Sequence, residues 1–318
     1  MQSADRIVEV YSGAAAVLVP CASRKRLQPD RNASAVSLHR SDQTDLETAW
    51  LQQLRKLPVA CEATELYGGR GFQLARQAST IADAPLYIVS AGLGLVAAER
   101  PVPTYGLTVS GRGPESIAAR VNGRFDAVSW WHAVNKGPYS TPLASIFKRN
   151  ASQPVVIALS QPYARMLASS LDALTDADVA RLRVIGVNLD TVLSSRFAPS
   201  LLPYDERLEA IMPGTRADFP QRALLHFASE GLAICPGADA STHSGWVQSA
   251  LAGRRAPARR QRPRLSDDDI LALIKRHLPT MTGIGRLLRV LRNQEGVACE
   301  QARFSRLYRA AIEERTAA

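Results

Sequence analysis

The chain has 318 residues, of which 46% are hydrophobic and 21% are charged, and its formal net charge is +10. At about 100–200 residues per domain, this length predicts two domains. No apolar run approaches the roughly 18 residues of a membrane span. The N-terminus lacks the basic start and apolar core of a signal peptide, so we expect a cytoplasmic protein with no membrane contact.

The four cysteines are too widely separated to predict a metal site. They stand at positions 21, 61, 235 and 299, without a C-x-x-C pair and without neighbouring histidines. Structural zinc sites need closely spaced ligands of this kind. We therefore expect no metal and no cofactor, and a reducing compartment fits this cysteine usage.

Apolar runs of strand length alternate with helical patterns through the first 252 residues. The expected strands are 14–19, 86–90, 154–160 and 182–188; the expected helical stretches are 45–57, a segment that begins at the turn 67–72, 115–134, 163–174 and part of 200–232. This alternation indicates an α/β fold with a mainly parallel sheet flanked by helices. We assign it to residues 1–252 as the catalytic domain.

Positive charge is concentrated after residue 252. Residues 253–318 contain 15 Lys and Arg against 7 Asp and Glu, a balance of +8, whereas the preceding residues contain 24 against 22. Residues 253–264 are rich in Arg and Pro without an apolar period, which is typical of a linker. The natural partner of such a basic segment is a polyanion, most often nucleic acid.

Three short helical patterns follow the linker, in residues 265–318. Ser266 precedes Asp267, Asp268 and Asp269, an order expected at a helix N-terminus. The second and third patterns carry repeated arginines. A small basic all-helical module of this kind is typical of helix-turn-helix DNA-binding domains, and a solvated helical cap is the alternative.

Polar residues and a glycine stand at the ends of three of the expected strands. They are Cys21, Ser23 and Lys25 after the first strand, Ser90 and Gly92 after the second, and Ser160 and Tyr163 after the third. Ligands of α/β proteins bind at the carboxyl ends of the strands, and glycine lets backbone approach a ligand closely. The pattern favours a pocket for a polar or anionic group, and ordinary strand–loop connections are the alternative.

Aromatic residues near these loops are candidates to stack on a flat base or sugar. They are Tyr105, Tyr163 and Trp131. Because Trp130 and Trp131 are adjacent, they cannot both face one side of a helix, and we expect at least one to be exposed or to line a cleft. The alternative is that the two tyrosines pack at the rim of the pocket.

Charged residues cluster between positions 205 and 222. Asp205 and Asp218 alternate there with Arg207, Arg216 and Arg222. A carboxylate beside a sugar can stabilise an oxocarbenium-like transition state or activate water, and arginine can pair with phosphate through two hydrogen bonds. The alternative is a structural Asp–Arg network that holds the loop.

These motifs, in this order, resemble the YaaA-like superfamily. That group has five features in order: an S-x-x-G-L motif after a strand, a Pro–Tyr loop, a Trp-bearing helix, a Ser-x-x-Tyr strand end and a late polar motif. In the same order, the matching stretches here are 90–95, 103–105, 130–131, 160–163 and 204–222. A related group of uncharacterised bacterial domains adds a Cys-Ser-Lys-type motif and a Leu-Tyr-x-x-x-x-Phe motif, similar to 21–25 and 66–72. The resemblance covers residues 15–232 and does not include the basic tail.

The resemblance implies nucleic-acid binding and, in chains similar to antiphage DNA glycosylases, excision of modified bases. Our leading hypothesis is a glycosylase that flips a modified base out of duplex DNA and hydrolyses its N-glycosidic bond, with Asp205 or Asp218 as the catalytic carboxylate. The expected base or substrate contacts are Cys21, Ser23, Lys25, Ser90, Gly92, Tyr105, Trp131, Ser160 and Tyr163. The expected phosphate contacts are Arg216, Arg222, Arg259, Arg260, Arg286, Arg289, Arg303 and Arg306.

Two further hypotheses for the function remain open. The first is a non-catalytic DNA-binding protein that senses damage or modification, which needs the basic tail but no catalytic carboxylate. The second is a base-modifying transferase, which needs a small-molecule co-substrate. Within the leading hypothesis, a Schiff base on Lys25 would add strand cleavage to base excision.

Overall fold

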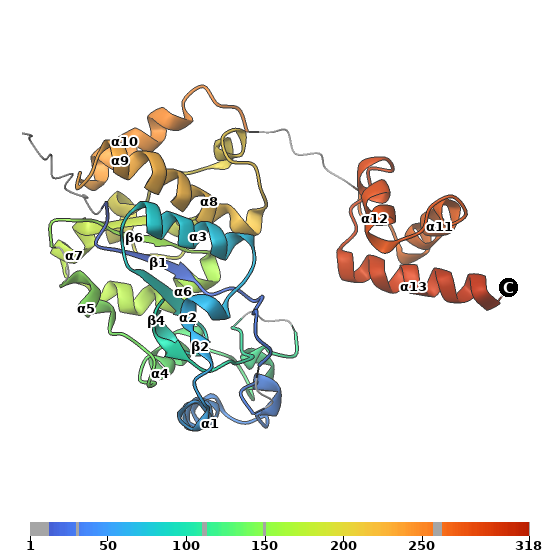
Figure 1. The fold of residues 1–318 in the computed structure, drawn as a ribbon, viewed down its shortest axis with the longest axis horizontal. Helices are drawn as coiled ribbons and strands as arrows, with labels where there is room; N and C mark the ends of the chain where they lie inside the picture. Colours follow the sequence, from blue (N-terminus) through green and yellow to red (C-terminus); the bar gives the residue numbers. More distant parts are fainter. Residues whose placement is uncertain (1–12, 30–31, 110–112, 149–150, 257–262, 318) are drawn as a thin grey trace, which may run out of the picture. The chain divides into compact units, whose positions relative to one another are not determined.

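The computed structural model describes residues 13–29, 32–109, 113–148, 151–256 and 263–317 (Figure 1). The chain divides into two compact units, Met1–Pro257 and Ala258–Ala318. The division falls within residues 253–264, the stretch that the sequence predicts as a linker. Each unit is described by itself below.

A five-stranded sheet forms the centre of the first unit, in the order β4-β3-β1-β6-β7. The strands are β1 (Ala16–Pro20), β3 (Leu86–Ser90), β4 (Gly94–Ala97), β6 (Val155–Ala158) and β7 (Leu182–Ile185). All neighbours are parallel except β3 and β4. The mainly parallel α/β sheet expected from the sequence is therefore confirmed. The unexpected strand is β4, which returns beside β3 after Gly94, where a φ of +82° reverses the chain.

Helices and a small two-stranded ladder surround this sheet. The helices are α1 (Gln43–Lys56), α2 (Ala63–Leu66), α3 (Arg70–Ile81), α4 (Ala127–Val134), α5 (Leu143–Phe147), α6 (Gln161–Asp172), α7 (Asp176–Arg181), α8 (Phe219–His226), α9 (Leu232–Ile234) and α10 (Ala240–Leu251). The ladder pairs β2 (Cys61–Glu62) with β5 (Pro101–Val102). The helix expected over 115–134 is wrong in its first half, where only a 3₁₀ turn, Ile117–Arg120, precedes α4.

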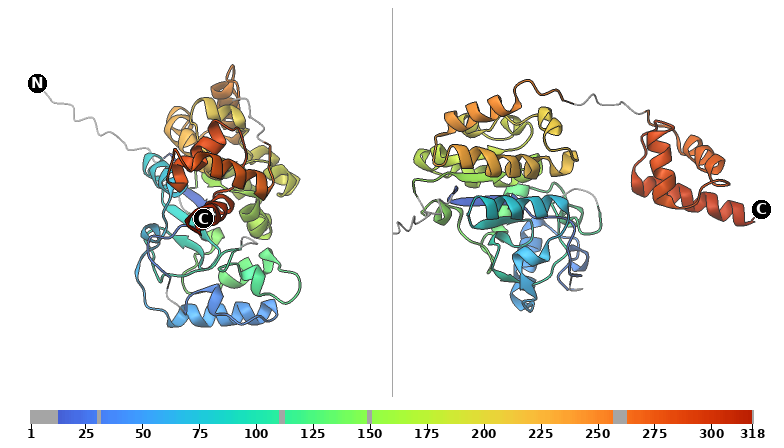
Figure 2. Two further views of the ribbon diagram at one scale, coloured as in Figure 1. Left: turned by 90° about the vertical axis from the view of Figure 1, so that its right-hand side faces the viewer. Right: turned by 45° about the horizontal axis from the view of Figure 1, so that its top comes forward.

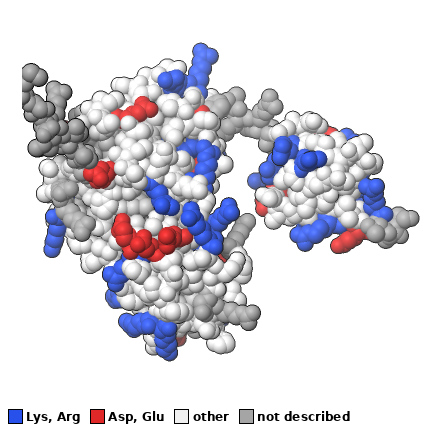
Figure 3. Space-filling model, viewed as in Figure 1, with Lys and Arg blue, Asp and Glu red and all other residues white. Residues whose placement is uncertain are grey.

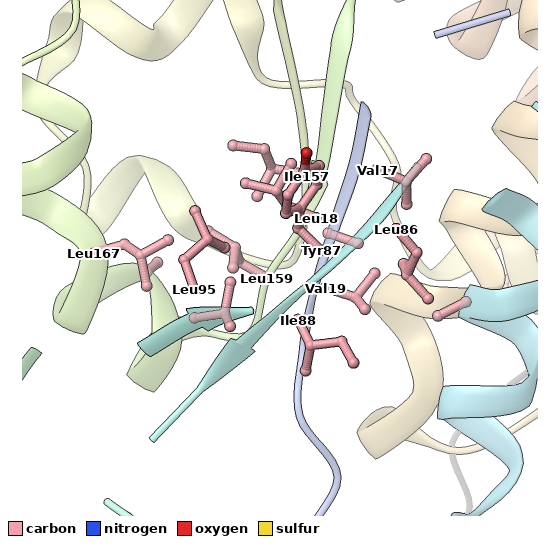
Figure 4. Close-up of a cluster of buried hydrophobic side chains, with 14 of the residues drawn as sticks. Val17, Leu18, Val19, Leu86, Tyr87, Ile88, Leu95, Ile157, Leu159 and Leu167 are labelled. Atoms are coloured by element: carbon pink, nitrogen blue, oxygen red, sulfur yellow. The ribbon is translucent and has the colours of Figure 1, made fainter. Parts of the chain in front are cut away.

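The sheet lies between two helical layers (Figures 1 and 2). Helices α3 and α8 pack on each other and on β1 and β6, while α4 and α6 pack together. Figure 4 shows Leu167 of α6 on the opposite side of the strands from α3 and α8. Because strand side chains alternate between faces, Leu18 and Val19 of β1 contribute to different layers of the core, and both are fully buried.

The described residues of the second unit form three helices around their own apolar core. They are α11 (Asp267–His277), α12 (Ile284–Asn293) and α13 (Gln301–Ala317). Ile274, Leu287 and Phe304 are among the buried residues at their centre. The Ser266 hydroxyl accepts from the Asp269 backbone, and the Asp269 carboxylate accepts from the Ser266 backbone, so α11 begins with a capping box. In the described part of the chain, no helix is long and apolar enough to cross a membrane.

Candidate functional site

A cavity of about 560 Å³ opens at the carboxyl edge of the sheet, beside the ends of β1 and β6. From β1 the chain continues to β3 on one side, whereas from β6 it continues to β7 on the other. The loops that leave β1 and β6 therefore diverge, and such a reversal of strand order creates a ligand crevice in open α/β sheets. The cavity lies at the place where this topology favours binding.

Six stretches of the chain, far apart in the sequence, line this cavity. They are the loop 20–25 after β1, the turn 68–72 that begins α3, the segments at 107–108 and 115, and residues 215–221 at the start of α8; Ser160 and Tyr163 of the β6–α6 connection complete it. Gly69 precedes α3 with a φ of +97°, a conformation that glycine adopts readily. The predicted residues that lie together here are Cys21, Ser23, Lys25, Ser160, Tyr163 and Asp218.

Cys21 and Tyr163 contact each other in the wall of the cavity. The Cys21 sulfur lies 3.1 Å from the Tyr163 hydroxyl. Burial first, and then the neighbouring Cys21, raises the pKa of Tyr163 well above its ordinary value. The phenol is therefore neutral at physiological pH and presents a hydroxyl and part of its ring.

Three cationic side chains line the cavity: Arg24, Lys25 and Arg70. The Lys25 ammonium lies 4.5 Å from the centre of the Tyr105 ring, within the range of a cation–π contact. Arg70 lies 3.4 Å from the Asp218 carboxylate, and its side chain remains 56% exposed. Arg70 is absent from the residues predicted above, although its Gly-Gly-Arg-Gly setting at a helix start offered a signal for it.

Ser90 and Tyr105 belong to a buried hydroxyl cluster beneath the cavity rather than to its wall. Tyr67, Ser90 and Tyr105 are all 0% exposed, and their hydroxyls join pairwise at 2.8–3.2 Å. Burial raises the pKa of both tyrosines far above the ordinary value. The expectation that Ser90 and Tyr105 contact a base is wrong, because the strand-end turn folds inward and encloses them.

The expectation that Gly92 contacts a base is also wrong, because it does not line the cavity and its close neighbours are protein side chains. A Cβ placed on Gly92 would lie 2.5 Å from the Tyr105 ring and 3.1 Å from Trp50. The Trp50 indole N–H donates to the Gly92 carbonyl at 2.7 Å. The absence of a side chain serves core packing at this turn.

Gly92→Ala is expected to destabilise the first unit by about 1–3 kcal/mol through overpacking. The added methyl group must displace Tyr105 or Trp50, because both rings lie against this position. Urea unfolding followed by tryptophan fluorescence measures the change. Gly245→Ala, on α10 with no atom within 4 Å of an added Cβ, is the control; an equal effect in the two variants would contradict the packing role.

Trp131 does not line the cavity and cannot stack on a base there. Trp130 and Trp131 are 0% and 2% exposed, so the expectation that one of them is accessible is wrong. The Trp130 indole donates to Ala91 O at 2.8 Å, and the Trp131 indole donates to Ser170 Oγ at 3.1 Å. Both rings are covered because α4 packs against α1 as well as α6.

Asp218 is held in place by a buried network centred on Arg222. The Arg222 side chain is 0% exposed and contacts Asp218 at 2.9 Å and Glu209 at 2.6 Å. It also donates to backbone carbonyls at Met212 and Thr215. Arg222 is therefore a structural residue, and its expected phosphate contact is wrong. The structural Asp–Arg network that the sequence left open is present here.

Asp218 nevertheless borders the cavity as a carboxylate. Burial alone would raise its pKa, but hydrogen bonds from Thr215 and Arg222, together with the Arg222 charge, lower it overall. Its side chain is 8% exposed, and its second oxygen faces Arg70. Asp218 is therefore ionised and fixed in orientation.

The remaining predicted residues of the first unit lie away from the cavity wall. Asp205 pairs with Arg207 at 2.8 Å, and its side chain is half exposed. Arg216 is exposed in the 3₁₀ helix η6 (Arg216–Asp218). A catalytic role for Asp205 in this cavity is not supported by its position. Arg259 and Arg260 lie outside the described residues.

Glu115 is the second carboxylate of the cavity. Sequence reasoning missed it, because it stands in an unpatterned loop. It makes no ion pair within the described residues. Its Oε1 would lie 2.5 Å from a Cβ placed on Gly106, so the carboxylate rests against the Gly106 backbone. No group of three or more His, Cys, Asp or Glu side chains converges as metal ligands in the described part of the chain.

Comparisons with family models, curated proteins and solved structures find no match to this chain.

Proposed function

We propose that the protein is a DNA glycosylase of the YaaA-like type, which takes a flipped, modified nucleotide into the cavity at β1 and β6 and hydrolyses its N-glycosidic bond. One observation carries this proposal: two carboxylates, Glu115 and Asp218, and three cations line a single cavity. Its volume of about 560 Å³ lies within the ~300–1,000 Å³ typical of small-molecule sites.

The paired carboxylates suit hydrolysis through an oxocarbenium-like transition state. In the proposed step the bond between C1′ and the base nitrogen breaks, and its electron pair leaves with the base. Ionised Asp218 stabilises the positive charge that develops on the sugar. Glu115 takes a proton from the water that adds to C1′, and the departing base gains a proton in return.

The cations suit the phosphates that flank a flipped nucleotide. Arg24 is exposed at the rim of the cavity and Arg70 is more than half exposed, so both can reach a DNA backbone that lies outside. Arginine pairs with phosphate through two hydrogen bonds. Tyr163, which also lines the cavity, offers a neutral ring edge and hydroxyl to the base or the sugar.

The second unit suits a role in holding duplex DNA. Its three described helices are compatible with a helix-turn-helix-like module, and Lys and Arg side chains lie on its visible face in Figure 3. A tethered duplex-binding unit would raise the local concentration of DNA at the cavity. In this proposal the partner is double-stranded, modified phage DNA.

The experiment is to incubate the full chain with unmodified DNA and with heavily modified phage DNA, and to measure released bases by mass spectrometry. We expect a free modified base and an equal number of abasic sites from the modified DNA alone. Tight binding without release would overturn the proposal in favour of a sensor. Release that requires an added nucleotide or sugar donor would overturn it in favour of a transferase.

A further inference from the structure

Within residues 263–317 the excess positive charge resides on one helix. Residues 263–317 contain ten Lys and Arg and seven Asp and Glu. Helix α12 holds Arg286, Arg289 and Arg292 and no acidic residue, so the rest of this segment is electrically balanced. A helix that carries the whole net charge of residues 263–317 is the best candidate there for the polyanion-binding element.

Many of the cations outside α12 are engaged within the unit. Arg303 and Arg306 of α13 both pair with Asp267 at the start of α11, at 2.5 and 2.7 Å. Lys275 pairs with Glu314 and Arg276 with Glu295. The expected phosphate contacts of Arg303 and Arg306 are therefore not supported, because these side chains join α13 to α11.

Arg286 and Arg289 differ from these residues in both position and partners. Both are exposed, and neither makes an ion pair within the described residues. They stand three positions apart and so share one face of α12, whereas Leu287 and Leu291 enter the core. A shallow hollow of about 320 Å³ borders both arginines. The third arginine of α12, Arg292, instead donates to the Cys299 carbonyl.

We infer that α12 is the helix that enters the major groove of duplex DNA, with Arg286 and Arg289 directed to the edges of bases. Arginine forms two hydrogen bonds with the N7 and O6 atoms of guanine in this groove. Three helical residues advance about 4.5 Å along the axis, close to the ~3.4 Å between successive bases of a strand. The inference rests on the proposed function only in taking DNA as the ligand.

The test is binding of the full chain to short, unmodified duplexes by fluorescence anisotropy across a salt series. We expect Arg286→Gln/Arg289→Gln to weaken duplex binding about tenfold or more at each salt concentration, because both arginine–guanine contacts are lost. Arg309→Gln, an exposed arginine on α13, is the control; it removes one charge but no base contact and should change affinity by less than about threefold. Circular dichroism checks that each variant remains folded.

Groove use is tested separately with duplexes in which 7-deazaguanine replaces guanine, which removes the N7 acceptor from the major groove only. The wild-type protein should bind the substituted duplex more weakly, and the double variant should not distinguish the two duplexes. Equal wild-type affinity for both duplexes, or an equal loss in Arg309→Gln and the double variant, would overturn the inference. Failure of base release alone would leave it standing, because these duplexes carry no excisable base.

Discussion

Replacing Glu115 by glutamine is expected to lower the rate of base release by about 10²–10⁴-fold, the usual contribution of a general base. Glutamine keeps the size of the side chain but cannot accept the proton of the attacking water. Glu115 takes no part in the ion pairs of the described residues, so the fold should persist. Single-turnover release from modified DNA, measured by mass spectrometry, gives the rate, and duplex affinity should stay unchanged.

Asp205→Asn is the matched control for this variant. Asp205 is a half-exposed carboxylate that pairs with Arg207 and does not line the cavity. We expect Asp205→Asn to release base at nearly the wild-type rate. A large loss in Asp205→Asn, with little loss in Glu115→Gln, would place the chemistry outside the cavity.

Arg222→Met is expected to destabilise the first unit by about 3–5 kcal/mol, the cost of removing one partner from a buried ion pair. Methionine fills part of the volume, but it leaves Asp218 without its 2.9 Å partner and Glu209 without its 2.6 Å partner. The carbonyls at Met212 and Thr215 also lose their donor. Urea unfolding followed by tryptophan fluorescence reports this unit, because all four tryptophans lie in residues 1–257.

Arg207→Met serves as the control for Arg222→Met. It removes the same type of side chain from a pair with Asp205 that is largely open to solvent, and exposed pairs contribute only about 0–1 kcal/mol. Equal losses in the two variants would contradict the structural role assigned to Arg222.

The strands could be predicted closely because their residues are buried on both faces of the sheet. The run 86–90 coincides with β3, since an unbroken apolar stretch between Pro85 and the Ser-Ala-Gly turn has few other ways to fold. Strand β4 could not be predicted, because it depends on the reversal at Gly94. The sequence alone does not distinguish a hairpin from a loop that faces a ligand.

The candidate site could be predicted where it depends on strand ends. Cys21, Ser23, Lys25, Ser160 and Tyr163 follow β1 and β6, whose carboxyl ends meet at the cavity. The predictions for Ser90 and Tyr105 failed because both residues are buried. Each was expected to face a ligand, but inside the protein their hydroxyls bond to each other.

Charged residues were the hardest to place. Arg222 is enclosed by partners four to thirteen residues away, and that closure depends on the tertiary path of residues 209–222. Glu115 reaches the cavity only because Gly106 leaves room beneath its carboxylate. Neither relation has a sequence period or spacing that could reveal it.

Disulfide trapping tests most directly whether a base enters the cavity. The full wild-type chain is mixed with duplex DNA in which one cytosine carries a thiol on a short tether at N4, and the cross-linked cysteine is found by peptide mass spectrometry. Cys21 lines the cavity, whereas Cys61 and Cys235 are partly exposed elsewhere and act as internal controls. We expect a cross-link at Cys21, lost in Cys21→Ser. Bound DNA that leaves Cys21 unmodified, or that reacts at Cys61 or Cys235 instead, would contradict entry of a flipped base into this cavity.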